Sequence, residues 1–337
     1  MREKLITLET FRKKVAEHSD SFLVTEQAQK MYCTLLPQGL RVVKTPKEVV
    51  FPEWEEVYRF SFQDRSWKLT ETAGNDSTLR FLFLLPCEAK AVVEVLDGNF
   101  LKKDYVDKNY WQRRKNLRLV ILGCSTMPET CFCSLVGGSP LWRDKESIFV
   151  FPFQERLYVE NDDLALFEEG KRIDAEQRKA LMFAEEELKA KLPPSLPPDF
   201  PQKLYAHFEE TIWKELTWRC INCGACTFLC PTCYCFDLSV DGRLQGLALK
   251  TWDSCMFPKF TLHASSHNPR PTGKERVRQR VMHKFSYLPL REGYYGCVGC
   301  GICREICPVN WDIREVVERM AKHIGYSIRT CQEHLSS

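Results

Sequence analysis

Residues 220–231 read CINCGACTFLCP, and residues 297–308 repeat the same pattern as CVGCGICREICP. Each run has the form CxxCxxCxxxCP, which places three cysteines on one turn of chain and a fourth just before a proline. Three closely spaced thiolates can surround one 4Fe-4S cube, while the fourth thiolate points away and binds the other cube. The paired runs therefore predict two 4Fe-4S clusters that exchange their fourth ligands.

This exchange assigns four cysteines to each cube. Cluster 1 takes Cys220, Cys223, Cys226 and Cys307, and cluster 2 takes Cys297, Cys300, Cys303 and Cys230. Structural zinc is the alternative metal for a cysteine-rich segment. Zinc sites usually pair two short CxxC knots, whereas each run here holds four cysteines and ends in Cys-Pro, so the cubes are favoured.

The composition also indicates metal or redox chemistry rather than a disulfide framework. The 337 residues include 17 cysteines, which is an odd number. The N-terminus lacks the apolar core of a secretory signal, so we expect a cytoplasmic protein with reduced thiols. No apolar run approaches the ~18 residues that span a bilayer, so no membrane span is predicted. The net charge of +3 is too small to favour nucleic-acid binding.

A proline-rich segment divides the chain into two parts. Residues 192–201 read LPPSLPPDFP, and such a run can neither continue a helix nor join the interior of a sheet. Five cysteines precede residue 220 and twelve follow from there on. The long spacer between the two cysteine runs favours a helical domain over a compact β-type ferredoxin. We predict an α/β or α+β domain over residues 1–192, a stiff linker over 193–202, and a helical dicluster ferredoxin-like domain over 203–337.

Hydrophobic patterns predict a partly parallel sheet in the first domain. Buried strands are expected at residues 80–85, 117–122 and 148–151. Apolar positions at helical spacing over residues 88–96 place a helix between the first two strands, and such a crossover joins parallel strands. Capping-box patterns start two later helices, one at Asp174 with Gln177, and one at Asp312 with Glu315 that ends at Gly325.

Four further cysteines are expected at one edge of this sheet. Cys87 and Cys124 each follow a predicted parallel strand, and Cys131 and Cys133 lie in the loop after Cys124. The carboxyl ends of parallel strands meet at the edge where ligands bind in open α/β sheets. Because four thiolates are the number that a cube requires, we predict a third 4Fe-4S cluster at these residues. The alternative is four buried cysteines without a ligand.

Several motifs outside the two runs point to a known family. They are Pro86-Cys87-Glu88, Leu96-Asp97, Cys131-Phe132-Cys133, Gly137-Gly138, Cys230-Pro231-Thr232-Cys233-Tyr234-Cys235, Trp252-Asp253-Ser254-Cys255 and Arg280-Val281-Met282-His283-Lys284. In this combination, residues 80–320 resemble the iron–sulfur beta subunits of sulfhydrogenase-type nickel–iron hydrogenases and the A subunits of anaerobic sulfite reductase.

The resemblance implies a role for the chain and a set of partners. In that family the subunit is an electron wire between a flavin- and NAD(P)-binding subunit and a catalytic subunit that holds nickel–iron or siroheme. Some relatives occur in assemblies with heterodisulfide-reductase-like proteins. The resemblance also strengthens the expectation of the third cluster.

Seven basic residues are concentrated in the spacer between the two cysteine runs. They are Arg270, Lys274, Arg276, Arg278, Arg280, Lys284 and Arg291. We expect these cations to belong to a solvated or cluster-facing helix rather than to a nucleic-acid site, because cations nearby would offset the net negative charge of thiolate-bound cubes. His283 is assigned to the same surroundings and not to catalysis.

The leading hypothesis is therefore an electron-transfer subunit of an anaerobic, multisubunit oxidoreductase. A GxGxxG fingerprint and an independent active-site motif are both missing from the sequence, so no catalytic residue is assigned. A second hypothesis is direct reduction of a sulfur compound or disulfide at a cluster flanked by Cys233, Cys235 or Cys255. A third is an interaction module stabilised by zinc, with no redox role.

Overall fold

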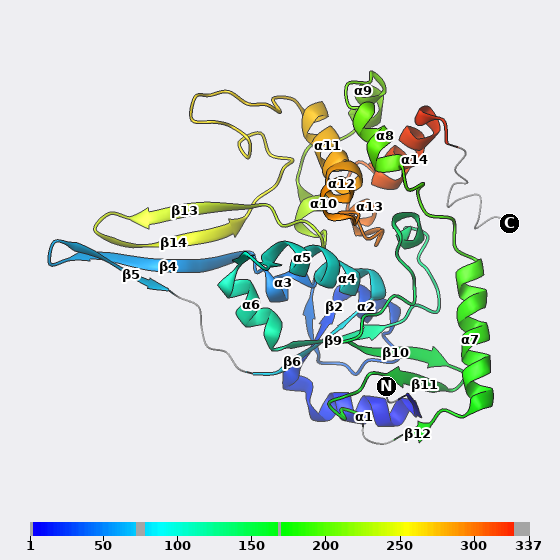
Figure 1. Cartoon of the computed structure of the whole chain (residues 1–337). Helices are drawn as coiled ribbons and strands as arrows, with labels where there is room; N and C mark the ends of the chain where they lie inside the picture. Colours follow the sequence, from blue (N-terminus) through cyan, green and yellow to red (C-terminus); the bar gives the residue numbers. More distant parts are fainter. Residues whose placement is uncertain (1–2, 72–77, 168–169, 327–337) are drawn as a thin grey trace.

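The N-terminal half is built around a mixed sheet (Figure 1). In the computed structural model, which describes residues 3–71, 78–167 and 170–326, this sheet has eight strands. Their spatial order is β12 (Lys171–Arg172), β1 (Lys4–Ile6), β11 (Arg156–Glu160), β10 (Ile148–Phe153), β9 (Leu117–Leu122), β6 (Arg80–Leu84), β2 (Phe22–Thr25) and β3 (Arg41–Val43). The strands from β10 to β3 run parallel, and β11, β1 and β12 form an antiparallel edge. The partly parallel sheet and its three expected strands are confirmed.

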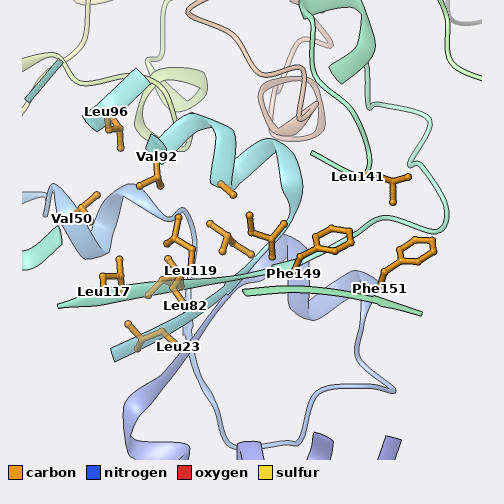
Figure 2. Close-up of a cluster of buried hydrophobic side chains, with 14 of the residues drawn as sticks. Leu23, Val50, Leu82, Val92, Leu96, Leu117, Leu119, Leu141, Phe149 and Phe151 are labelled. Atoms are coloured by element: carbon orange, nitrogen blue, oxygen red, sulfur yellow. The ribbon is translucent and has the colours of Figure 1, made fainter. Parts of the chain in front are cut away.

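Side chains of the central strands alternate between two apolar cores, one on each face of the sheet. Leu82 and Leu119 belong to the core that Figure 2 shows, where they point toward Val92 in the helical segment above them. Phe83, the next residue on β6, belongs instead to the core on the opposite face, together with Phe11 of the N-terminal helix. Because both faces are covered, the parallel strands read as unbroken apolar runs in the sequence.

Helices and one short hairpin complete the N-terminal half. They are α1 (Leu8–Glu17), α2 (Glu26–Met31), α3 (Lys47–Val50), α4 (Pro86–Lys90), α5 (Asp97–Phe100), β7 (Leu101–Lys102), β8 (Tyr105–Val106), α6 (Lys108–Lys115) and α7 (Ala175–Ala190). The helix expected over residues 88–96 is confirmed, and it continues beyond α4 through a π-helical turn, Ala91–Leu96. The Asp174 capping box at the start of α7 is also confirmed.

Short helices make up much of the C-terminal half. They are α8 (Phe200–Ala206), α9 (Ile212–Thr217), α10 (Ala225–Phe228), α11 (Gly273–Met282), α12 (Leu288–Glu292), α13 (Ile302–Glu305) and α14 (Ile313–Ile324). Their apolar sides meet in a third core that includes Trp213, Phe285 and Val317. Asp312 caps α14 and Gly325 ends it with a left-handed conformation, as the sequence predicts.

A second sheet joins the two halves of the chain. Within the described ranges its four antiparallel strands have the order β13 (Phe236–Gly242), β14 (Gln245–Trp252), β4 (Trp54–Gln63) and β5 (Ser66–Glu71). Strand β14 pairs with β4, so a hairpin between the two cysteine runs continues a hairpin of the N-terminal half. Figure 1 shows both hairpins extending together away from the helices. The sequence analysis did not predict this sheet.

The proline-rich segment between α7 and α8 lies against the N-terminal half. Leu196 is buried there, and its backbone N–H donates to the carbonyl of Leu135 at 2.8 Å. The boundaries at residues 1–192, 193–202 and 203–337 stay a sequence prediction, and residues 327–337 lie outside the described part of the chain. No helix in the described ranges is long and apolar enough to cross a membrane.

Candidate functional site

The two cysteine runs adopt the same backbone conformation. The residues on either side of the second cysteine have positive φ in both runs, at Asn222 (57°) and Gly224 (79°) in one, and at Gly299 (66°) and Gly301 (80°) in the other. Glycine favours this left-handed conformation because it has no Cβ. Each turn leads into a short helix, α10 or α13, that carries the third cysteine of its run. The repeated sequence pattern therefore produces two equivalent loops that curl around their thiols.

The two loops face each other, and α10 packs against α13. Cys230, the last cysteine of the first run, is close enough to influence the ionisation of each thiol that the sequence assigns to cluster 2, Cys297, Cys300 and Cys303. In the same way, Cys307 and Cys223 influence the ionisation of Cys220, and Cys220 influences that of Cys226. The structure thus brings together the members of each predicted ligand set.

One thiol of each set shows how burial makes these cysteines poor acids on their own. Burial, together with neighbouring thiols, raises the pKa of Cys297 to about 12 and that of Cys226 to about 11. A bound iron cluster would supply the positive charge that holds such thiols in their thiolate form. These surroundings fit metal ligands better than free, reactive cysteines.

Arg280 gives an independent test of whether an anionic cluster fits. This arginine on α11 is only 2% exposed, and its guanidinium bonds to the Cys303 thiol. Its Nε and Nη1 atoms have no hydrogen-bond partner among the described residues. A buried cation without a counter-charge is costly. A thiolate-bound cube carries about −2 in its oxidised form, so clusters in the two cysteine sets would neutralise Arg280.

Lys284 is the second buried cation at this site. Its Nζ donates to the thiol of Cys230 at 3.5 Å, to Thr232 Oγ1 at 2.7 Å and to the carbonyl of Gly296 at 2.7 Å. The thiols of Cys230, Cys233 and Cys297 raise the pKa of Lys284 despite its burial, so it stays charged. Lys284 therefore links the end of the first run to the start of the second.

Four of the seven residues of the basic stretch are buried, whereas Lys274 and Arg291 are exposed. Arg276, Arg278, Arg280 and Lys284 are each less than 10% exposed. Arg278 turns to the other side of α11, where it stacks 3.7 Å from the ring centroid of Phe208. Burial, followed by the charge of Lys284, lowers the pKa of His283 to about 4. The four buried cations therefore lie in the interior, and of these Arg280 and Lys284 are beside the cysteine thiols.

The third cysteine set also converges. Cys87 lies in the first turn of α4, Cys124 follows β9, and Cys131 and Cys133 lie in the next loop, all four lining one cavity. The thiols of Cys131 and Cys133 are within hydrogen-bonding distance of each other. Cys300, a predicted ligand of cluster 2, lines the same cavity. The edge of the parallel sheet and the second cysteine run thus share one site.

Two glycines allow this close contact between the halves. The backbone N–H of Phe132 donates to the carbonyl of Gly299 at 2.8 Å. A Cβ at Gly299 would lie 2.5 Å from the Phe132 carbonyl oxygen, and one at Gly301 would lie 2.5 Å from that of Thr130. Any larger residue would push the loop that carries Cys131 away from the second run.

Two charged residues at the site were missed by the sequence analysis. Lys47 reaches from α3 to donate to the carbonyls of Thr227 and Cys233, both at 3.1 Å. Glu88 accepts hydrogen bonds from Thr25 Oγ1 at 2.6 Å and from the backbone of Leu85 at 2.9 Å, and its burial raises its pKa to about 7. Glu88 stands beside Cys87 in a quoted motif, whereas nothing in the sequence singles out Lys47.

Three more cysteines gather at the base of the β13–β14 hairpin. The backbone N–H of Asp253 donates to the carbonyl of Cys235 at 3.0 Å, which extends the strand pairing beyond the hairpin. The thiols of Cys235 and Cys255 lie within hydrogen-bonding distance of each other, and the thiol of Cys233 lies within that distance of Cys230. Cys33 is exposed and apart from these groups.

Comparison with known proteins identifies the domain that holds the two runs. A family model described as a 4Fe-4S dicluster domain matches residues 219–311, which include both runs. This match overturns the zinc alternative. In the described ranges, no group of three or more His, Cys, Asp or Glu side chains is arranged to hold a single metal ion.

The chain is 31% identical over 274 residues to sulfhydrogenase 2 subunit beta of Pyrococcus furiosus. The match covers 77% of this chain and 78% of the relative. This chain belongs to the family of sulfhydrogenase beta subunits. Membership in the sulfhydrogenase beta family places it among the iron–sulfur electron-transfer subunits of oxidoreductases, as the sequence resemblance predicts.

A first prediction tests the exchange of fourth ligands in this sulfhydrogenase beta homologue. Cys230→Ala should damage the cube built on Cys297, Cys300 and Cys303, because Cys230 stands among those thiols. Electron paramagnetic resonance of the reduced protein, together with iron content, should then match a Cys300→Ala variant. If the signal lost is instead the one lost in Cys223→Ala, the ligand assignment is wrong.

A second prediction concerns the buried guanidinium. Arg280→Gln should shift cluster reduction potentials to more negative values, because it removes a positive charge that stabilises the reduced state. The shift should be on the order of 100 mV, the value for unit charges ~7 Å apart at an effective dielectric constant of ~20. Redox titrations followed by electron paramagnetic resonance would measure it. Arg278→Gln, on the far side of the same helix, is the matched control, and equal potentials in two iron-replete variants would contradict the prediction.

Proposed function

We propose that this chain is the electron wire of a multisubunit oxidoreductase and carries three 4Fe-4S clusters in series. The serial arrangement of the three cysteine sets carries this proposal. Cys303 of the second set is close enough to Cys226 of the first to influence its ionisation. Cys300 of the second set lines the same cavity as the third set. Electrons can pass along such a row inside the protein.

The proposed ligands follow the sequence assignment. Cluster 1 is held by Cys220, Cys223, Cys226 and Cys307, and cluster 2 by Cys297, Cys300, Cys303 and Cys230. Cluster 3 is held by Cys87, Cys124, Cys131 and Cys133. The shared surroundings of each set support these assignments, and the buried cations Arg280 and Lys284 support anionic clusters between them.

The proposed partners stand at the two ends of this wire. One binds a flavin and NAD(P), because hydride transfer requires a two-electron acceptor that cubes do not provide. The other is a catalytic redox subunit of the hydrogenase, sulfite reductase or heterodisulfide-reductase-like type. The relative from Pyrococcus furiosus, a subunit of a sulfhydrogenase, favours the hydrogenase type.

A second candidate function is direct reduction of a disulfide or another sulfur compound. The observation that favours it is the group formed by Cys233, Cys235 and Cys255 next to the predicted cluster ligand Cys230. Two electrons from the clusters and two protons would convert a substrate disulfide into two thiols. Turnover of a disulfide or polysulfide by the isolated, chemically reduced chain would favour this candidate over the wire.

The third cluster gives a quantitative prediction. Full-length protein purified without oxygen should contain ~12 irons per chain, and Cys131→Ala combined with Cys133→Ala should reduce this to ~8. Cys33→Ala, which removes an exposed cysteine outside the three sets, should leave the iron content unchanged. If the folded double variant has the same iron content as the wild type, these cysteines do not bind a cluster.

The absence of a hydride acceptor gives a prediction about turnover. The purified single chain, free of flavin, should not oxidise NADH or NADPH when an artificial dye is the final acceptor. Addition of the flavin- and NAD(P)-binding partner should restore the reaction. Steady oxidation of NAD(P)H by the flavin-free chain alone would contradict the proposal that a partner subunit carries out hydride transfer.

A further inference from the structure

The sheet formed by β4, β5, β13 and β14 extends away from the rest of the chain, and we call it the arm (Figure 1). Residues that lie directly opposite on neighbouring strands share one face of a sheet. Phe60 lies opposite Leu69 and Phe62 lies opposite Trp67 on β4 and β5. By the same register, one face of the arm carries Tyr58, Phe60, Phe62, Trp67, Leu69, Leu238, Val240 and Ala248. The same face also holds Gly242 and Gly246, Glu71 opposite Tyr58, and Lys250 opposite Leu238.

This apolar face is open to solvent. Leu69, Val240 and Leu238 are 69%, 61% and 60% exposed. The rings of Phe62 and Trp67 lie 5.1 Å apart between centroids, and they form a continuous patch with the aliphatic side chains. The opposite face is mainly polar, and its pairs of opposed residues include Ser61 with Lys68 and Arg59 with Thr70. Leu247 and Leu249 are its apolar members. Such one-sided patterning is typical of a sheet whose apolar face is covered.

A groove lies where the apolar face meets the body of the protein. Tyr58 and Leu238 line it on the arm, and Val106 and Asn109 line it on the side of β8 and α6. The charges of the groove are paired internally. Lys250 contacts Glu55 and lies 2.8 Å from Asp107, and Glu55 also pairs with Arg113. Lys108 lies 2.7 Å from Glu71. Neither the groove nor the face therefore offers an unbalanced charge to an ionic ligand or to nucleic acid.

The size of the face indicates what covers it. Its strands have between 6 and 10 residues. At ~3.3 Å per residue and ~4.8 Å between strands, the face covers roughly 500 Å2. Two copies that met through this face alone would bury roughly 1,000 Å2, which is below the ~1,200 Å2 of a stable interface. The occupant must therefore cover the face and the adjoining wall of β8 and α6 together.

We propose that the apolar face of the arm is the docking site of another subunit of the redox complex, one that presents an uncharged apolar surface. This inference rests on the proposed function as an electron-transfer subunit. The base of the arm supports it, because β13 follows directly after Cys235 and β14 leads into Cys255. A subunit that covers the arm down to its base would therefore approach Cys235 and Cys255, near the predicted cluster 2.

The test uses the full chain in its assembled complex. A photo-reactive p-benzoylphenylalanine replaces Leu69 or Leu238 on the apolar face, or the adjacent Lys68 or Ser239 on the polar face. All four residues are exposed, so the two pairs differ in the face they occupy. Cross-links from positions 69 and 238 to one redox subunit, with few from 68 and 239, are expected. Equal yields from both faces would overturn the proposal.

Charge substitutions give the second measurement. Leu69→Lys with Leu238→Lys should weaken subunit association at least 10-fold in size-exclusion or binding assays, while iron content and unfolding midpoint stay unchanged. Thr70→Lys with Ser239→Lys, which adds the same two charges to exposed positions on the polar face, is the matched control. If the complex forms normally with the Leu69→Lys and Leu238→Lys variant, the docking site is wrong but the proposed electron-transfer function stands. If the wild-type chain isolates without any redox subunit, the proposed function fails.

Other occupants would be detected by the same variants. Cross-links between two copies of this chain would assign the face to self-association. Flotation of the wild-type chain with phosphatidylethanolamine and phosphatidylglycerol vesicles, lost in the Leu69→Lys and Leu238→Lys variant, would assign it to a membrane surface. Either result would overturn docking of a redox subunit.

Discussion

Cys230 lies among the thiols of the second cysteine run although a long spacer separates them in the chain. Much of the C-terminal half follows from this constraint. The spacer must leave the first run and return to the second, and it does so through the β13–β14 hairpin and then through α11. The hairpin becomes half of the arm. Helix α11 delivers Arg280 to the interior, and the π-helical turn that follows it, His283–Tyr287, delivers Lys284. The pairing of the two cysteine loops thus accounts both for the β13–β14 half of the arm and for the buried cations of the domain.

Charge balance links this architecture to electron transfer. Thiols that are buried together resist ionisation, and buried cations resist isolation. Anionic clusters between the thiols and the cations would remove both costs. The iron would hold the thiols as thiolates, and the negative charge of the cubes would offset the positive charge of Arg280 and Lys284. We expect the same cations to raise the reduction potentials of the clusters. Stability and redox function therefore depend on the same few side chains.

The two halves of the chain act as one unit at this site. Gly299 and Gly301 let the loop that carries Cys131 approach the second run, and Lys47 reaches from α3 to the end of the first run. The pairing of β4 with β14 adds a continuous sheet across the halves. A third cluster at the edge of the parallel sheet would therefore adjoin the dicluster domain rather than stand apart from it.

The sequence by itself determined the features that depend on local spacing. The two cysteine runs, the apolar strands around residues 80–85 and 117–122, and the cap at Asp174 all follow from nearby residues, and the cysteines after the strands follow from the rules of parallel sheets. The role of Lys47, the burial of the Arg280 guanidinium beside the cysteine thiols, and the arm were decided only in the tertiary structure. Each of these joins segments far apart in the chain, and a single sequence holds no periodic signal for such contacts. The apolar face of the arm could not be predicted, because its strands acquire a common face only after β14 pairs with β4.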